Sequence, residues 1–372
     1  MAAWVNMPHS GHFEQGATVC TNGGGDAGSS GGAVTFTGRD PIVGSPLPFA
    51  TMAAVTLMAK AVSVAELWRF RGGQGQDLSI NLGKALHRLC PFYDKKWELL
   101  NGYAPGNPAD PKNPFMPTNM YRTRDNRRVL FMNIYPRIRS AALTFLGCND
   151  DPTAIGSVIR RWDAFDLEEQ ANRAGLQATV VRSAQEFLDT EQCRYLEDLP
   201  LVHIEKIADS DPEPFTPRPQ TPLGGVRALG FSHVIAGPGM GRGLAYHGAD
   251  VLNLWTPDDF EMDFNYYSAN VGMRSAIMDF RRPEEMARFR RLVTGADIFF
   301  ANRLAEGLSQ VAGCRWFQRL DNKERQLRTP QFSDYSVAHR LLNPPPILPR
   351  LGRSPRWHRR SERNTRCGSP VR

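Results

Sequence analysis

The feature that most constrains the fold is a glycine-rich turn between two apolar runs in the second half of the chain. Residues 226–231 form the first run and predict a strand. Four glycines follow at every second position: Gly237, Gly239, Gly241 and Gly243. The turn leads into a helix that extends to Tyr246, and residues 249–255 then supply a second apolar run of strand length. Strand, turn, helix and strand together predict a β-α-β unit.

A third round of the same alternation follows. A helix is predicted from Pro283 to about Val293, and Gly295 separates it from an apolar run over residues 296–301. Strands that alternate with helices are typical of a parallel sheet with helices on its faces. We therefore predict an α/β protein.

The glycine-rich turn is suited to hold an anion. Tight turns before a helix leave backbone N–H groups available, and the helix N-terminus adds a partial positive charge, so a phosphate group is a natural ligand. Arg242 and Arg274 would add charge-assisted contacts. Two alternatives stay open: the glycines serve only close packing of the helix on its strand, or Gly237, Gly239 and Asp259 imitate the fingerprint of NAD-binding proteins. The NAD alternative is the weaker one, because the spacing does not fit the GxGxxG pattern and a proline lies inside the turn.

Four motifs in the same part of the chain resemble the class III CoA-transferase family. In chain order they are residues 233–238, 244–252, 270–275 and 296–303. They follow one another at the spacing of that family. The resemblance implies that this segment is the amino-terminal part of a Rossmann-like domain that holds coenzyme A (CoA). It also implies a set of residues that contact CoA: Ile235, Ala236, Gly237, Arg274, Asn302 and Arg303.

The composition is that of an ordinary soluble globular chain with room for two domains. The protein has 372 residues, of which 41% are hydrophobic and 10% aromatic. No apolar run approaches membrane-spanning length, and the first residues lack the pattern of a secretory signal, so we expect a cytoplasmic protein with no membrane partner. The six cysteines are scattered without a CxxC pair, which argues against a disulfide framework and against a metal site.

The net charge of +7 comes from the C-terminal tail. Residues 340–372 hold nine arginines against the single acid Glu362, so the rest of the chain carries a net charge of −1. The tail is rich in proline and has almost no apolar periodicity, which predicts disorder. An arginine-rich tail can bind RNA or an acidic surface, but we favour a solvated tail and expect no nucleic-acid partner.

The first part of the chain adds a helix and a strand to the predicted fold. Residues 1–34 are rich in glycine and serine and predict a disordered segment. The pattern over residues 48–71 predicts a helix that is buried on most faces. Residues 74–82 then predict a strand, with Leu78, Ile80 and Leu82 on one face. Residues 97–136 are rich in proline and predict loops. A further helix is predicted over residues 162–172.

The resemblance to the family extends to this first part, but in reversed order. The helix, the strand and Gly73–Gln76 between them resemble the part of the family that follows its catalytic aspartate. Residues 175–188 resemble its small domain. This order implies a double-length family member whose first copy lacks its beginning and whose second copy stops early.

We therefore divide the chain into five parts. They are a disordered segment at 1–34, a region at 35–215 that resembles the later part of a CoA-transferase unit and includes a smaller α+β domain, a linker at 216–222, a Rossmann-like CoA-binding segment at 223–310, and a divergent tail at 311–372 that is disordered from about residue 340.

The resemblance implies transfer of CoA between carboxylates. In the family an aspartate attacks an acyl thioester and forms covalent intermediates. Asp40 is the nearest candidate for this nucleophile, and the alternative for Asp40 is a turn residue before Pro41. We expect a CoA-transferase that moves CoA between a short acyl-CoA, such as acetyl-CoA, and a carboxylate acceptor. CoA is then a substrate, no cofactor or metal is permanently bound, and the family implies a homodimer.

Two other functions stay open. The family also contains acyl-CoA racemases, which move an α-proton with a His/Asp pair and a glutamate, but neither His87 nor His247 can be matched to that motif. The second alternative is a non-catalytic remnant that binds CoA or a partner.

Overall fold

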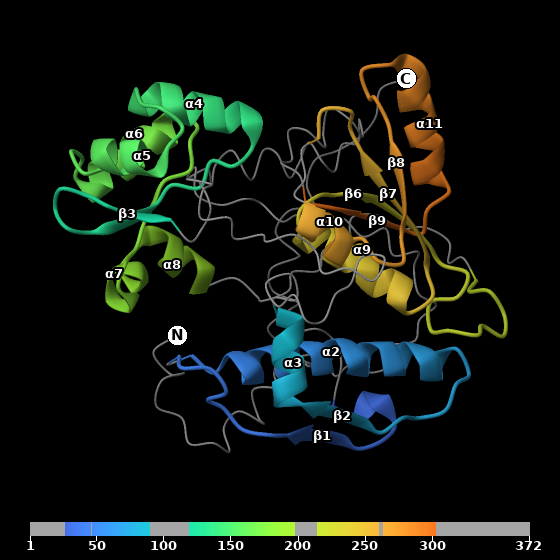
Figure 1. Cartoon of the computed structure of the whole chain (residues 1–372). Coiled ribbons are helices and arrows are strands. Elements are labelled where there is room, and N and C mark those ends of the chain that lie inside the picture. Colours follow the sequence, from blue (N-terminus) through green and yellow to red (C-terminus); the bar gives the residue numbers. More distant parts are fainter. Residues whose placement is uncertain (1–26, 46, 90–118, 198–213, 260–262, 303–372) are drawn as a thin grey trace, which may run out of the picture.

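The described part of the chain falls into three groups of elements. In the computed structural model these residues are 27–45, 47–89, 119–197, 214–259 and 263–302. Figure 1 shows an N-terminal group (27–89), a middle group (119–197) and a sheet group (214–302). Helices pack with parallel strands, so the predicted α/β class is confirmed. Our predictions for residues 1–26 and 303–372, including the disordered tail, lie outside the described residues.

The sheet group follows the predicted alternation of strands and helices. Its elements are β6 (Arg227–Phe231), α9 (Ala236–Tyr246), β7 (Asp250–Trp255), α10 (Asp263–Ala269), β8 (Arg274–Ile277), α11 (Pro283–Thr294) and β9 (Ile298–Ala301). The four strands are all parallel and lie in the order β8-β7-β6-β9. The β-α-β unit, the third round after it and the parallel sheet are therefore confirmed.

Strands β6, β7 and β9 are covered on both faces, which explains why they are largely apolar. Side chains alternate between two core clusters along β9, where Phe299 faces one cluster and Phe300 the other. The cluster around Phe299 packs against Phe289 of α11, and the cluster around Phe300 packs against Leu244 of α9. The two helices thus lie on opposite faces of the sheet.

The strand order creates a topological switch point between β6 and β9. From β6 the chain adds β7 and then β8 on one side, and it returns to place β9 on the other side. In open parallel sheets, ligands bind at the carboxyl ends of the strands at such a point. Here those ends are Phe231 and Ala301, which are paired in the register of β6 and β9.

Strand β8 and helix α10 have no counterpart among the predicted elements. All four residues of β8 are exposed, and Ile277 is 71% exposed. An edge strand of this kind has neither the apolar run of a buried strand nor a regular alternation of apolar and polar residues. Its sequence therefore carries little signal.

The N-terminal group is a long helix beside a two-stranded parallel sheet. Its elements are η2 (Ala27–Ser30), β1 (Val34–Thr37), α2 (Phe49–Phe70), β2 (Leu78–Asn81) and α3 (Leu82–Leu89). Helix α2 confirms the predicted helix, and β2 confirms the predicted strand. The disorder predicted up to residue 34 is wrong for its last residues, because η2 and the start of β1 are ordered and pack against α2 and β2.

Helix α2 buries one stripe, so the prediction that it is buried on most faces is wrong. The buried stripe includes Ala50, Ala54, Met58 and Val62, whereas Met52 is 46% exposed. By length and composition alone, α2 is the one helix among the described residues that could cross a membrane, in contrast to our expectation. Its stripe packs against α3, as a core helix of a globular protein also does.

The middle group is a three-stranded antiparallel sheet surrounded by short helices. Its elements are β3 (Met120–Arg122), β4 (Arg128–Leu130), α4 (Pro136–Leu146), α5 (Pro152–Ile159), α6 (Ala164–Arg173), β5 (Thr179–Val180), α7 (Ala184–Leu188) and α8 (Glu191–Glu197). Helix α6 confirms the helix predicted at 162–172. The loop prediction for 97–136 is wrong for β3 and β4, which form a hairpin around the turn at Asn126, where φ is +61°.

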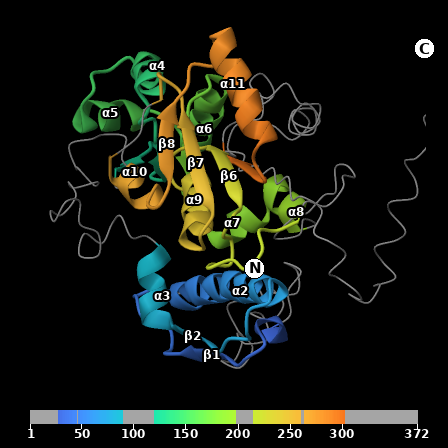
Figure 2. The ribbon, with the colours of Figure 1, turned by 90° about the vertical axis from the view of Figure 1, so that its right-hand side faces the viewer.

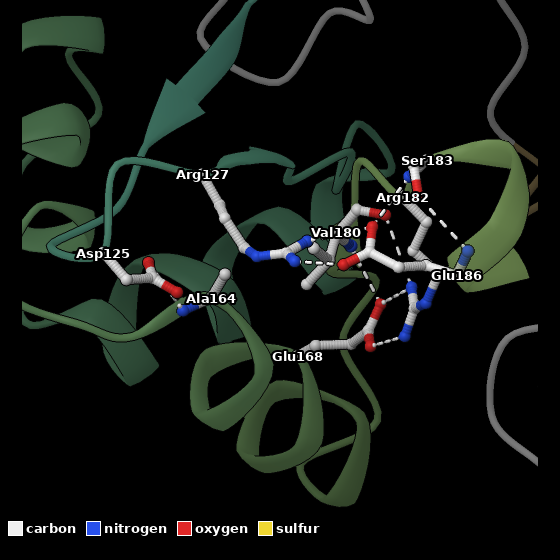
Figure 3. A network of polar contacts seen from close by, with 8 residues as sticks. All are labelled: Asp125, Arg127, Ala164, Glu168, Val180, Arg182, Ser183 and Glu186. Carbon is white, nitrogen blue, oxygen red and sulfur yellow. Dashed lines mark hydrogen bonds and ion pairs between the residues drawn. The ribbon is translucent and has the colours of Figure 1, made fainter.

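A polar network fastens α6, β5 and α7 of the middle group together (Figure 3). The buried Glu168 carboxylate accepts hydrogen bonds from Val180 N at 2.8 Å and from the guanidinium of Arg182. Glu186 pairs with Arg127 and closes the capping box of α7 with Ser183. Because these acids and bases satisfy one another, we interpret the network as structural.

Long-range contacts join the groups. Arg71 at the end of α2 donates to the carbonyl oxygens of Pro222 at 2.7 Å and of Thr216 and Gly224 at 2.9 Å. Its guanidinium lies 4.7 Å from the ring centre of Phe215. These contacts hold the start of the sheet group against α2, which lies beside that group in both views (Figure 2).

Candidate functional site

The site is built on the turn between β6 and α9, which begins at the buried Ser232. The Ser232 hydroxyl donates to Asn253 Oδ1 at 2.9 Å, and the Asn253 side-chain amide donates back to the carbonyl oxygen of Ser232 at 3.0 Å. Asn253 lies on β7 and has no exposed surface. A buried amide needs hydrogen-bond partners, so this exchange fixes the end of β6 against β7.

The side chain of Asn302 holds the next residue of the turn. His233 N donates to Asn302 Oδ1 at 3.0 Å, and Asn302 Nδ2 donates to the carbonyl oxygen of His233 at 2.8 Å. Asn302 directly follows β9, so its amide pairs with the backbone as another strand would. The carboxyl ends of β6 and β9 are thereby joined at the switch point.

The turn contains a strained residue. Val234 has a φ of +62°, in the left-handed region that a β-branched residue rarely adopts. Such a conformation costs about 1–3 kcal/mol and persists only where the surroundings enforce it. The hydrogen bonds at Ser232 and His233 hold the chain immediately before it.

The start of α9 offers backbone donors to an anion. Among the described residues no side chain caps the helix, and its first turn holds no acidic residue. Pro238 has no N–H group, and Gly239 N donates to the carbonyl oxygen of Ile235 at 2.8 Å. The N–H groups of Ala236 and Gly237 have no acceptor among the residues that the structure describes. With the partial positive charge of the helix start, they suit a phosphate or a polarised carbonyl oxygen.

Gly237 lets the helix start approach the switch point. A Cβ at this position would lie 2.6 Å from Asn302 Oδ1 and would also clash with Ser232. Gly239, by contrast, has open space where a Cβ would go. Gly237 therefore does serve close packing, as one of the alternatives states. The N–H donors at the start of α9 lie at the switch point only because Gly237 allows this close packing.

The structure brings four of the six predicted CoA contacts together. Ala236, Gly237 and Asn302 meet at the switch point, and Ile235 lies beside them with 44% of its surface exposed. Arg303 lies outside the described residues.

Arg242 and Arg274, which we expected to contact a bound phosphate, do not reach the turn. Arg274 is in register with Leu252, before the carboxyl end of the sheet, and its guanidinium pairs with Asp250 at the amino end of β7. Arg242 donates to the carbonyl oxygen of Ser268 in α10. Both side chains thus have protein partners away from the helix start.

Asp40, the candidate nucleophile, lies at the start of α2. Its carboxylate accepts hydrogen bonds from Thr51 N at 2.7 Å and Thr51 Oγ1 at 2.6 Å. Burial by itself would raise the pKa of Asp40, but the hydrogen bonds from Thr51 and from the Ile42 backbone outweigh burial and lower that pKa. The carboxylate is therefore kept ionised while it caps the helix, which is the role expected of a structural residue.

Sequence reasoning missed several residues that shape the turn. Asn253 gave a usable signal, because it is a polar residue inside a run predicted to be a buried strand. Ser232 and Tyr135 gave none. The Tyr135 hydroxyl lies 3.4 Å from His233 Nδ1, a contact between residues 98 apart that no local pattern encodes.

A comparison with known protein families finds a match over this same segment. A family model described as CoA-transferase family III matches residues 223–312. Residues 223–312 are therefore similar to CoA-transferase family III. The family resemblance of the four motifs is confirmed. Asp259, on which the NAD alternative rested, accepts a hydrogen bond from Thr256 N at 2.7 Å within a local turn.

The CoA-transferase relatives are longer than the matched part of this chain. The succinate–glutarate CoA-transferase of Agrobacterium fabrum is 35% identical over 112 residues, 25% of this chain and 28% of that protein. The acetyl-coenzyme A transferase nodX of Hypoxylon pulicicidum is 26% identical over 198 residues, 49% of this chain and 33% of that protein. A solved CaiB/BaiF family protein from Brucella suis is 30% identical, with a TM-score of 0.22 over 24% of this chain and 28% of that one. The chain spans about a third or less of the length of these relatives.

Proposed function

We propose that the protein binds CoA at the turn between β6 and α9 and transfers it between an acyl-CoA and a carboxylate. One observation carries the proposal: in a segment that matches CoA-transferase family III, the N–H groups of Ala236 and Gly237 have no acceptor among the described residues and lie at a helix start beside a switch point held by Asn302. An anionic or polarised oxygen of an acyl-CoA is the ligand that these donors suit.

A short acyl-CoA is the donor we propose, and a small carboxylate is the acceptor. The names of two relatives contain acetyl-coenzyme A and the dicarboxylates succinate and glutarate, which makes acetyl-CoA and succinate suitable first probes. A homodimer in the cytoplasm remains part of the proposal.

For the chemical step we propose Asp40 as the nucleophile. Its carboxylate would attack the thioester carbonyl, expel the CoA thiolate and form a mixed anhydride. The CoA thiolate would then attack the aspartyl carbonyl, which forms an aspartyl-CoA thioester and releases the donor acid as a carboxylate. The acceptor carboxylate would attack this thioester and expel CoA again, which gives a second mixed anhydride. Attack of the CoA thiolate on the acceptor's carbonyl would form the new acyl-CoA and regenerate the aspartate. The lowered pKa of Asp40, which follows from its hydrogen bonds with Thr51 despite partial burial, keeps the carboxylate in the ionised form that this attack requires.

The exchange of CoA from acetyl-CoA to succinate tests this proposal. The parent protein should form succinyl-CoA. Asp40→Asn keeps an acceptor for Thr51 and so should keep the melting temperature, but it removes the nucleophile and should abolish exchange without changing CoA affinity. Exchange that survives in Asp40→Asn would show that another carboxylate does the chemistry.

A non-catalytic CoA-binding protein is the second candidate function. It is favoured by the engagement of Asp40 in capping α2. CoA binding without exchange for any acyl-CoA and carboxylate pair would support this candidate over the transferase.

A further inference from the structure

A tyrosine and a histidine meet where the middle group touches the turn of the sheet group. His233 directly follows Ser232, and its backbone is held by Asn302. Its imidazole contacts Tyr135, the residue that precedes α4. The Tyr135 hydroxyl lies 3.4 Å from His233 Nδ1, and the two rings are 6.1 Å apart at an interplanar angle of 82°. Both residues are half-buried.

The chemistry of this pair suits a carboxylate. A hydroxyl-to-nitrogen distance of 3.4 Å is longer than that of a strong hydrogen bond, so the direct contact is weak and replaceable. A tyrosine hydroxyl and an imidazole N–H can each donate one hydrogen bond. Two donors this close can serve the two oxygens of one carboxylate, and bonds to a charged acceptor are stronger than the contact they would replace.

The position of the pair suits the acceptor of the proposed reaction. His233 lies three residues before Ala236, whose N–H group is one of the donors at the helix start. A carboxylate between Tyr135 and His233 would therefore lie close to an acyl-CoA held at that start. The positive end of α9 favours a second negative group nearby.

We propose that Tyr135 and His233 bind the carboxylate of the acceptor, an inference that rests on the proposed CoA transfer. The middle group thus contributes directly to recognition of the substrate, through one residue at the start of α4. The two residues are binding residues that orient the carboxylate, and the nucleophile is a separate group.

The test follows the His233 ring by NMR in the full chain. Protein with carbon-13-labelled histidine is titrated with succinate, with and without saturating CoA, and His233→Gln assigns the signal. Succinate should shift the His233 resonance saturably, and Tyr135→Phe should weaken succinate binding about tenfold, the effect of losing one hydrogen bond to a charged group. Tyr195→Phe, an exposed tyrosine of α8, is the matched control and should bind succinate as the parent does.

Two results would overturn the inference. One is a folded protein in which succinate leaves the His233 resonance unchanged. The other is equal succinate affinity in Tyr135→Phe and Tyr195→Phe, which would mean that the pair only packs two groups together. CoA affinity, measured by calorimetry on the same samples, tests the proposed function separately, because Tyr135→Phe should leave it unchanged.

Discussion

Glu168 and Glu169 are neighbours in α6 with opposite surroundings. The Glu168 side chain is 6% exposed and pairs with Arg182, whereas the Glu169 side chain is 61% exposed and pairs with Arg173 on the surface of the helix. A buried charge that loses its partner is costly, while a surface ion pair contributes little. The two residues therefore form a matched pair for testing which charges stabilise the middle group.

Glu168→Gln should lower the free energy of unfolding by roughly 3 kcal/mol, because it leaves the guanidinium of Arg182 without its carboxylate in a mostly buried site. Glu169→Gln should lower it by less than about 1 kcal/mol. Urea denaturation of both variants measures the difference. Equal effects would show that the network around Glu168 does not stabilise the fold.

Glu186 should make the stability of the protein depend on acidity. The hydrogen bond from Arg127, with that from Ser183, lowers the pKa of Glu186 from 4.5 to about 2. Because the folded state has the lower pKa, the ionised carboxylate stabilises the fold fully at a pH above the pKa of the unfolded state. This stabilisation is lost as the pH falls through the pKa of the folded state. Urea midpoints should therefore fall less between about pH 5 and pH 2 in Glu186→Gln than in the parent. If the urea midpoints of the parent and of Glu186→Gln fall equally with pH, the Glu186 carboxylate does not contribute to the pH dependence of stability.

At the scale of elements, α9 shows which glycines the fold requires. A Cβ on Gly241 would lie 2.6 Å from Phe300 Cζ and would clash with Met273, whereas Gly243 has open space around it. Gly241→Ala should therefore destabilise the protein by about 1–3 kcal/mol through overpacking. Gly243→Ala should be neutral or stabilising, because alanine favours the helix. Thermal unfolding compares the two, and a stable Gly241→Ala variant would contradict the packing of α9 on the sheet.

The sequence predicts elements where local periodicity decides the structure. Strands β6, β7 and β9 are apolar runs bounded by glycine, and α9 and α11 lie between them, so their types and order could be predicted. β8 is exposed at the sheet edge and has no such pattern. Ala236, Gly237 and Asn302 could be placed at the site because family motifs include them. The contacts of Tyr135 and of Asp40 depend on tertiary structure and could not be predicted.

At the scale of the whole molecule, Arg71 links α2 to the sheet group. It reaches three carbonyl oxygens and the Phe215 ring, a geometry that lysine cannot reproduce with one ammonium group. Arg71→Lys should lower the free energy of unfolding by about 2 kcal/mol. Arg69→Lys is the control, because Arg69 donates one exposed hydrogen bond to Ser29, and it should change stability by less than about 0.5 kcal/mol. If both variants unfold alike, the two groups are held together by other contacts.

The central claim is that CoA binds at the start of α9, and calorimetric titration of CoA into the full chain tests it most directly. The parent and Gly239→Ala should release the same binding heat with the same affinity, because a Cβ at Gly239 meets open space. Gly237→Ala should bind at least about tenfold more weakly, because its Cβ would lie 2.6 Å from Asn302 Oδ1 and displace the N–H donors. A folded parent protein that releases no heat with CoA, or a Gly237→Ala variant that binds CoA as well as Gly239→Ala does, would contradict the claim.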